Sequence, residues 1–238
     1  EIRRYLLEND LLDAIVSLPS DIFYNTGIPT YIWILDNMKP AERRGKVLLI
    51  DAHEFYEKRR KPQGEKRNDI SPEQISMIVN VYGEFKDGTY GSGDKKCETR
   101  IMNASEFGYV KVAITAPELD KDGEPVRKTL KSGKLGKVIY DKSKNDTESI
   151  PLGVVDLEPG IDIVENPIVR ERMDDYMENE VRPFVKYAEI ISNKSKVGYR
   201  IPFTRFFYKY SPPRQSQEIL AEIMALDEEI SRIRKEAE

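Results

Sequence analysis

The chain has 238 residues, enough for one large domain or two small ones. Its net charge is −4, so nucleic-acid binding would require a local basic surface. One cysteine (Cys97) and one histidine (His53) exclude an internal disulfide and argue against a structural zinc site or a His-dependent catalytic triad. Because no apolar run approaches the roughly 20 residues that cross a bilayer, we expect a cytoplasmic protein without membrane or metal contacts.

The first 56 residues carry an α/β pattern. Ile2, Tyr5 and Leu6 recur at helical spacing, and because the sequence opens inside a helix without methionine, we expect a fragment of a longer protein. Apolar runs over 14–18, 30–35 and 46–51 lack alternation, which predicts strands buried on both faces of a sheet. The short connection between the last two runs predicts an antiparallel hairpin.

A basic segment follows over 57–69. Its composition predicts a loop that links two domains. The positive charges are Lys58, Arg59, Arg60, Lys61, Lys66 and Arg67, with the first four as the main candidates for phosphate contacts. These cations either contact DNA phosphates or belong to a solvated surface loop, and the sequence does not decide between the two.

Residues 70–210 predict a mixed α+β region. Ser71, Pro72 and Gln74 form a helix start signal ahead of an apolar stripe. Glycine-rich residues 85–96 predict a loop, in which Gly91-Ser92-Gly93 is a flexible link and not a phosphate site. Short strands are expected over 110–116 and 137–140, and a helix over 173–181.

The last segment, 211–238, predicts a long helix. Its apolar residues recur at alternating intervals of four and three, which is typical of a seam between paired helices. The seam consists of Ile219, Ile223, Leu226, Ile230 and Ile233. The helix either folds back on its own domain or pairs with another chain.

No catalytic signature is complete. Asp51 and His53 follow a predicted strand, but Asp-x-His at that place is usually an ordinary loop start. Asn166-Pro167 lacks the second proline and the aromatic residue of the Asn-Pro-Pro-aromatic tetrapeptide of adenine methyltransferases, and no strand precedes it. We therefore assign no catalytic residue.

The most informative stretch is 18–32, in which two predicted strands flank a loop with adjacent aromatic residues, Phe23 and Tyr24. Aromatic rings on a rigid loop at a sheet edge can form a stacking platform for an extruded base. The alternative is that one of the rings only caps the sheet.

This stretch resembles the modification (M) subunit of type I restriction-modification systems, an adenine-N6 DNA methyltransferase that uses S-adenosylmethionine. Further similar segments occur in the order found in that family. They are 2–12, Phe23-Tyr24-Asn25-Thr26-Gly27-Ile28-Pro29-Thr30, 45–52, 70–82, Ser105-Glu106-Phe107-Gly108-Tyr109, 146–152, 180–183 and 197–210. The likeness covers most of the chain and is weaker over 153–172.

The resemblance implies that residues 1–56 are the C-terminal part of the catalytic domain and supply the last strands of a Rossmann-like sheet. Phe23 or Tyr24 then corresponds to the ring that stacks on the flipped adenine. Thr26, Gly27, Pro29 and Thr30 would shape the loop, with Gly27 supplying unusual φ/ψ freedom and Pro29 rigidity. The glycine-containing cofactor loop and the Asn-Pro-Pro-Phe motif would lie upstream, so the isolated chain is expected to be inactive.

The resemblance also implies partners. They are DNA, a specificity (S) subunit that docks on the C-terminal seam, a second M subunit and a restriction (R) subunit. Arg205, Lys209 and Arg214 lie among aromatic residues and either contact phosphates or extend from a core of Phe203, Phe206 and Phe207, the role that we prefer for these rings. A competing hypothesis treats the chain as a non-catalytic assembly module that works through the seam.

Overall fold

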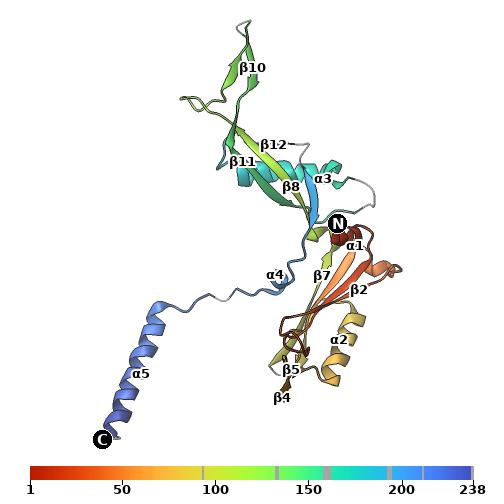
Figure 1. Cartoon of the computed structure of the whole chain (residues 1–238), viewed down its shortest axis with the longest axis vertical. Helices are drawn as coiled ribbons and strands as arrows, with labels where there is room; N and C mark the ends of the chain where they lie inside the picture. The colour runs from red at the N-terminus through yellow and green to blue at the C-terminus, as the bar shows by residue number, and fades with distance from the viewer. Residues whose placement is uncertain (93, 132–133, 158–161, 192–194, 211, 237–238) are drawn as a thin grey trace. The chain divides into compact units, whose positions relative to one another are not determined.

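The computed structural model describes all residues except 93, 132–133, 158–161, 192–194, 211 and 237–238. The chain divides into two compact units, Glu1–Phe203 and Thr204–Glu238. The described part of the first unit contains two larger sheets, two two-stranded sheets and several helices, and the second unit contains the C-terminal helix (Figure 1).

The first sheet has the strand order β2-β1-β3-β7-β6. β1 is parallel to β3, and every other neighbouring pair is antiparallel. A short helix, α1, precedes the sheet. The bounds are α1 Ile2–Glu8, β1 Leu12–Ser17, β2 Tyr31–Leu35, β3 Lys46–Asp51, β6 Gly88–Ser92 and β7 Lys95–Asn103.

The predicted hairpin between the second and third strands is wrong. β2 pairs with β1 and forms the edge of the sheet, and β1 separates it from β3. The predicted burial of the second strand is also wrong, since four of the five residues of β2 are exposed. An apolar run gives no information about which strand lies at an edge, and a short connection does not require its two strands to be neighbours.

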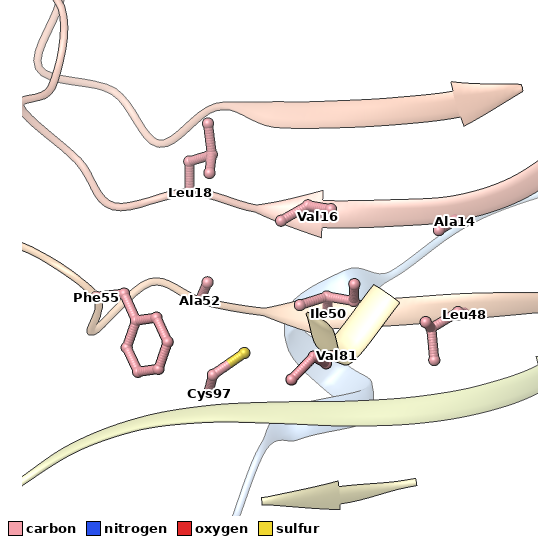
Figure 2. Packing of buried hydrophobic residues seen from close by; sticks show 9 residues of the cluster. All are labelled: Ala14, Val16, Leu18, Leu48, Ile50, Ala52, Phe55, Val81 and Cys97. Atoms are coloured by element: carbon pink, nitrogen blue, oxygen red, sulfur yellow. The ribbon is translucent and has the colours of Figure 1, made fainter. Parts of the chain in front are cut away.

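The core of this unit lies between the sheet and helix α2 (Pro72–Glu84). Figure 2 shows alternate residues of β1 and β3 pointing toward Val81 of α2, with Leu48 and Ile50 fully buried. Burying side chains of this size stabilises the fold by about 1.5–3 kcal/mol each. The predicted start of α2 is confirmed, because Ser71 and Gln74 form a reciprocal capping box ahead of Pro72.

Two predicted loops contain strands. Residues 57–69 form a hairpin of β4 (Glu57–Gln63) and β5 (Lys66–Asp69), closed by a turn in which Gly64 has φ +60°. The basic linker is therefore an ordered hairpin. Residues 85–96 contain β6 and the start of β7, while Gly93 lies outside the described residues. The composition of both segments predicts loops, because short, exposed strands with charged side chains lack the apolar pattern by which a strand is recognised in a sequence.

The second sheet is built around β8 (Gly108–Pro117). The strand order is β11-β8-β12, and β13 also pairs with β8. The other strands of this sheet are β11 Tyr140–Pro151, β12 Glu189–Ile190 and β13 Lys196–Tyr199, while β9 Arg127–Thr129 and β10 Leu135–Val138 form a separate two-stranded sheet. The strands expected over 110–116 and 137–140 are present, within β8 and across β10 and the start of β11.

Helix α3 (Pro167–Tyr176) continues into a π-helical turn at Met177–Val181, so the helix expected over 173–181 exists and begins earlier. Asn166 explains that start, because its side-chain Oδ1 accepts a hydrogen bond from the backbone N–H of Ile168 at 2.9 Å. Asn166 is therefore the N-cap of α3, and Pro167 occupies its first turn. This structural role agrees with the interpretation that Asn166-Pro167 is not a catalytic motif.

The C-terminal region contains α4 (Phe203–Phe207) and α5 (Ser216–Glu236). Phe203 is buried, and its ring meets that of Tyr31 edge-on at a centroid distance of 5.2 Å, which fits the preferred core role. The seam residues of α5 are 42–58% exposed. None of the helices in the described part of the chain is long and apolar enough to cross a membrane.

Candidate nucleic-acid interface

The loop that carries Phe23 and Tyr24, residues 18–30, is called the aromatic loop. It follows the carboxyl end of β1, and a hydrogen bond from Leu18 N to Thr30 O (2.9 Å) closes its base. Asp21 has φ +58°, and a bridge joins Phe23 to Thr26 across a tight turn. Phe23 is 43% and Tyr24 62% exposed, so the loop presents both rings to solvent.

The hairpin β4–β5, called the basic hairpin, follows β3. Because β1 and β3 are parallel neighbours, the segments after their carboxyl ends emerge at the same edge of the sheet. Glu65 N donates to Tyr24 O at 3.0 Å, and Arg67 N donates to Asp21 O at 2.9 Å. The buried Asn68 adds a side-chain bond to Ser20 O at 3.0 Å.

Gly64 lies at the closest approach of the two segments. A Cβ atom at this position would lie 2.5 Å from Tyr24 O, a backbone atom that has no rotamer with which to move away. The positive φ and the close contact both require glycine. The aromatic loop and the basic hairpin are therefore joined through their backbones, so that the hairpin fixes the position from which the rings project.

The cations of the basic hairpin fall into two groups. Arg59 Nη1 and Lys66 Nζ both bind the carboxylate of Asp69 at 2.9 Å, and Lys66 Nζ also lies 5.2 Å from the centre of the Tyr24 ring. The hydrogen bond from Lys66, with further contributions from Arg59, lowers the pKa of Asp69 and keeps its charge. These two cations hold the hairpin and the aromatic ring in place.

The second group consists of Lys58, Arg60, Lys61 and Arg67, which are exposed and form no ion pair with any residue that the structure describes. Three of the four predicted phosphate-binding residues therefore have available charges, and Arg59 does not. Arg67, the last residue of the predicted basic cluster, is exposed as well.

The loop-shaping residues have distinct surroundings. The hydroxyl of Thr26 accepts a hydrogen bond from Ile28 N at 3.3 Å. Gly27 does not have a positive φ, so the expectation that it supplies unusual φ/ψ freedom is wrong. Glycine fits here for a steric reason, because a Cβ atom at this position would lie 2.6 Å from the Asp21 carboxylate. Thr30 Oγ1 is buried and has no hydrogen-bond partner among the described residues. Pro29 lies between Ile28 and Thr30, where the chain enters β2.

The same sheet edge carries Asp51 and His53. Asp51 Oδ1 accepts from His53 N at 3.3 Å and lies 2.9 Å from His53 Nδ1, which is the geometry of a loop start. In the described part of the chain, no three His, Cys, Asp or Glu side chains lie close enough to bind a metal. Leu18, Ala52 and Phe55 beside this edge belong to the packed core. These residues do not form a cradle for a nucleoside cofactor.

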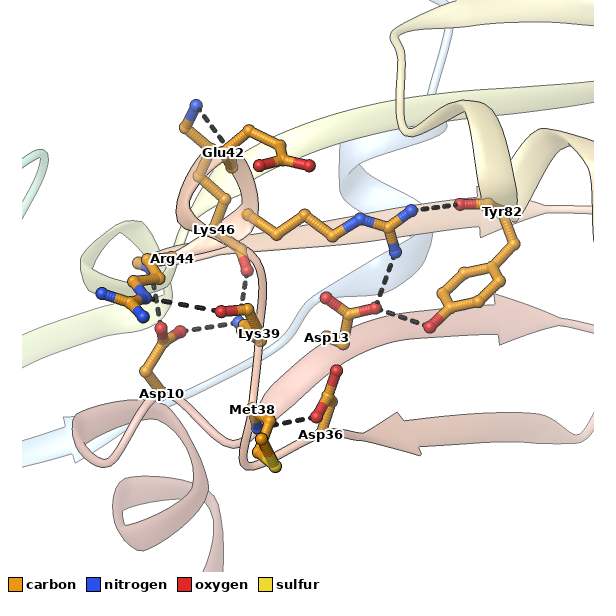
Figure 3. A network of polar contacts seen from close by, with 11 residues as sticks. Asp10, Asp13, Asp36, Met38, Lys39, Glu42, Arg44, Lys46 and Tyr82 are labelled. Carbon is orange, nitrogen blue, oxygen red and sulfur yellow. Dashed lines mark hydrogen bonds and ion pairs between the residues drawn. The ribbon is translucent and has the colours of Figure 1, made fainter.

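A buried polar network lies at the opposite end of β1 (Figure 3). Asp13 Oδ2 accepts hydrogen bonds from Arg43 Nη1 (3.0 Å) and from the hydroxyl of Tyr82 on α2 (2.7 Å). Burial, followed by the contact with Asp13, raises the pKa of Tyr82. The guanidinium of Arg43 lies 4.5 Å from the ring centre of Phe85. The network ties α2 to the strand that leads into the aromatic loop, and sequence reasoning missed it.

A neighbouring pair extends this network. Lys39 is 5% exposed, and its Nζ binds Asp10 Oδ1 at 2.6 Å and Lys46 O at 2.7 Å. Asp10 Oδ2 accepts from Gly45 N at 3.0 Å. Both carboxylate oxygens of Asp10 are therefore used to fix the connection between β2 and β3 (Figure 3).

Residues 1–106 match the family model described as N-6 DNA Methylase. This segment contains the aromatic loop, the basic hairpin and α2.

Among curated proteins, the MjaVIII methylase subunit of a type I restriction enzyme from Methanocaldococcus jannaschii is 44% identical over 86 residues, 36% of this chain and 14% of that protein. The MjaIX methylase subunit of the same organism is 35% identical over 123 residues, 52% of this chain and 19% of that protein. The chain therefore spans less than a fifth of the relatives that it matches.

A crystal structure of the type I restriction-modification methyltransferase subunit of Streptococcus thermophilus is 28% identical, over 44% of this chain and 19% of that chain, with a TM-score of 0.36. The family match and the curated relatives agree with the resemblance carried by the motifs. They show that residues 1–106 are similar to the N-6 DNA Methylase family, and that part of the chain is similar to methylase subunits of type I restriction enzymes.

Proposed function

We propose that this chain supplies the aromatic wall and a set of phosphate contacts for a DNA methyltransferase that modifies adenine N6. The observation that carries the proposal is the pair of exposed rings, Phe23 and Tyr24, on a loop that the basic hairpin holds in place. Both segments lie inside the part of the chain that matches the N-6 DNA Methylase family.

The aromatic rings would act on a base that has left the duplex. The N6 amino group of an adenine in a duplex is base-paired, and the stacked base cannot enter an enclosed active site, so the base must be extruded. Stacking of a base on an aromatic side chain contributes about 1–3 kcal/mol, which offsets part of the cost of unstacking. A loop fixed by backbone hydrogen bonds presents the ring without a further ordering cost.

The basic hairpin would position the DNA strand next to the rings. Lys58, Arg60, Lys61 and Arg67 have no carboxylate partner among the described residues, so phosphate oxygens can take that place. Such contacts hold the nucleic acid in register and carry no sequence information themselves. Sequence recognition is then the task of another component, for which the specificity subunit is the proposed candidate.

The remaining chemistry would come from other residues of the whole subunit. S-adenosylmethionine supplies the methyl group when it is bound, and we propose that the cofactor loop and the catalytic motif lie outside this chain. The chain alone is then inactive, and its own residues hold the target base and the DNA backbone.

The proposal is tested with the whole subunit assembled with its partners. Phe23→Ala and Tyr24→Ala are compared with Ile28→Ala, a control on the same loop whose side chain is apolar, 66% exposed and not aromatic. The loss of about 1–3 kcal/mol of stacking corresponds to a rate of DNA methylation that is about 5- to 150-fold lower. One of the two aromatic variants should show this loss and the control should not. Unchanged rates in both aromatic variants would refute the stacking role.

A second role, subunit docking, is favoured by the exposed seam on α5. The charged residues beside the seam include Glu222, which pairs with Arg214 at 2.7 Å, and Glu229. An apolar stripe with charged flanks is suited to pairing with a long helix of another chain. We propose the specificity subunit as that partner, within an assembly that also contains a second M subunit and a restriction subunit.

A further inference from the structure

A second basic surface lies far from the basic hairpin in the sequence. β8 and β11 pair as far as Pro117 and Tyr140, and the chain beyond that pair continues as the small hairpin of β9 and β10. Hydrogen bonds from Glu118 N to Ile139 O and from Ile139 N to Val126 O, both 2.9 Å, connect this hairpin to the sheet. Figure 1 shows β10 beyond the end of the β8–β11 ribbon. Residues 126–131 and 134–144 are called the basic arm.

The charge of the basic arm is almost entirely positive. Residues 126–140 contain five cations and no carboxylate, in a chain whose net charge is −4. The five are Arg127, Lys128, Lys131, Lys134 and Lys137. Lys142 and Lys144 follow, with Asp141 as the one acidic residue of the arm. All seven cations are exposed, and none forms an ion pair with a residue that the structure describes.

The acidic residues at the base of the arm are engaged elsewhere. The carboxylate of Glu124 accepts a hydrogen bond from the hydroxyl of Tyr187 at 3.1 Å, and Glu189 accepts from the hydroxyl of Tyr140 at 2.6 Å. Asp120 Oδ1 accepts backbone hydrogen bonds from Asp122 and Glu124, both at 2.9 Å. These carboxylates bind neutral donors, and none of them forms an ion pair with a cation of the arm that the structure describes.

Some cations elsewhere in the described part of the chain have a carboxylate partner close in the sequence. Arg4 pairs with Glu8, and Arg182 pairs with Glu178, one helical turn apart in each case. The arm differs because its cations repel one another over a short ribbon, an arrangement that a bound polyanion would stabilise.

We propose that the basic arm binds the phosphate backbone of double-stranded DNA and does not read its sequence. A duplex carries one negative charge per about 1.7 Å of axis, which suits cations spaced along a narrow ribbon. Residues 126–139 contain no aromatic, asparagine or glutamine side chain, so stacking and amide contacts to bases are absent there. The identity of the partner, DNA, rests on the proposed function, and the binding rests on the charges of the arm.

The test measures the affinity of the 238-residue chain for a fluorescein-labelled duplex by fluorescence anisotropy, over a range of salt concentrations. The arm variant carries Lys131→Gln, Lys134→Gln and Lys137→Gln. The matched control carries Arg3→Gln, Lys86→Gln and Lys96→Gln, which remove equal charge from exposed positions outside both basic surfaces. Thermal unfolding followed by circular dichroism verifies that both variants fold.

Each phosphate contact contributes about 0.9 to the slope of the logarithm of affinity against the logarithm of salt concentration. We expect the slope of the arm variant to fall by about 2–3 and that of the control to stay unchanged, for two duplexes of unrelated sequence. Equal slopes in the arm variant and the control would overturn the proposal. So would a failure of the intact chain to bind either duplex at low salt.

Two parallel measurements separate this proposal from two alternatives, binding of DNA by the basic hairpin alone and binding of the arm to membranes. A variant with Lys58→Gln, Arg60→Gln and Lys61→Gln reports on the basic hairpin; if it alone weakens binding, the arm proposal fails and the proposed function stands. Leu130 and Leu135 of the arm are also exposed, as in a membrane-binding surface. Binding to phosphatidylserine vesicles that the arm variant loses, with duplex binding unchanged, would assign the arm to membranes and overturn the proposal.

Discussion

Replacement of Gly64 by alanine tests the connection between the basic hairpin and the aromatic loop. Gly64 has φ +60°, a conformation that costs an L-residue about 1–2 kcal/mol. The new Cβ would also lie 2.5 Å from Tyr24 O, so the hairpin turn must move away from the loop. That movement breaks the hydrogen bond from Glu65 N to Tyr24 O, which contributes about 0.5–1.5 kcal/mol.

We expect Gly64→Ala to make local opening of the turn easier by about 2–3 kcal/mol. Hydrogen exchange at the Glu65 amide should then become about 30- to 150-fold faster, since each 1.4 kcal/mol is a factor of ten. DNA methylation by the assembled enzyme should fall as well, because the rings lose their fixed position. The buried cluster of β1, β3 and α2 is not touched, so its amides should keep their protection.

Gly45→Ala is the matched control. Gly45 has φ +68°, but nothing lies within 4 Å of the position that a Cβ atom would take. The control therefore carries the backbone strain without the collision. If the Glu65 amide exchanges as slowly in Gly64→Ala as in Gly45→Ala, the hairpin does not hold the aromatic loop in the way described.

Four further outcomes are expected, at Tyr82, at Cys97 (two) and at the seam. Tyr82→Phe removes a hydrogen bond to the buried carboxylate of Asp13 and should lower the free energy of unfolding in urea by about 1.5–3 kcal/mol; a change below about 0.5 kcal/mol would contradict the network. Burial raises the pKa of the Cys97 thiol from 9.0 to about 12, so iodoacetamide at pH 8 should react only after unfolding. The unfolded thiol loses its proton first, so this group should lower stability as pH rises from about 9 toward 12, and Cys97→Ala should remove that part of the pH dependence. Charge at Ile223 and Ile230 (Ile→Lys), both already about half exposed, should leave the helical content unchanged and abolish co-purification with the specificity subunit; retained co-purification would exclude docking through the seam.

The elements that the sequence predicts correctly depend on local signals. Ser71, Pro72 and Gln74 define the start of α2 because each acts on backbone groups within one helical turn. The runs over 14–18 and 46–51 become β1 and β3 because a buried strand needs an apolar side chain on each face.

The errors concern partners that lie far apart in the chain. β2 is as apolar as β1, and only the pairing of the strands shows that β2 forms the edge. Asp13 and Tyr82 are 69 residues apart, so no local pattern connects them. For the site, the resemblance in the motifs singled out Phe23 and Tyr24, whereas the hairpin that holds their loop was hidden by its charged composition.

The contact between the aromatic loop and an extruded base is tested most directly by photocrosslinking. The assembled enzyme is bound to DNA that carries 5-iodouracil in place of the target adenine, and mass spectrometry identifies the residue that is joined to the base on irradiation. The account predicts a cross-link to Phe23 or Tyr24, with a lower yield when both are replaced by alanine. A cross-link located only outside residues 18–30, with unchanged yield in that double variant, would contradict it.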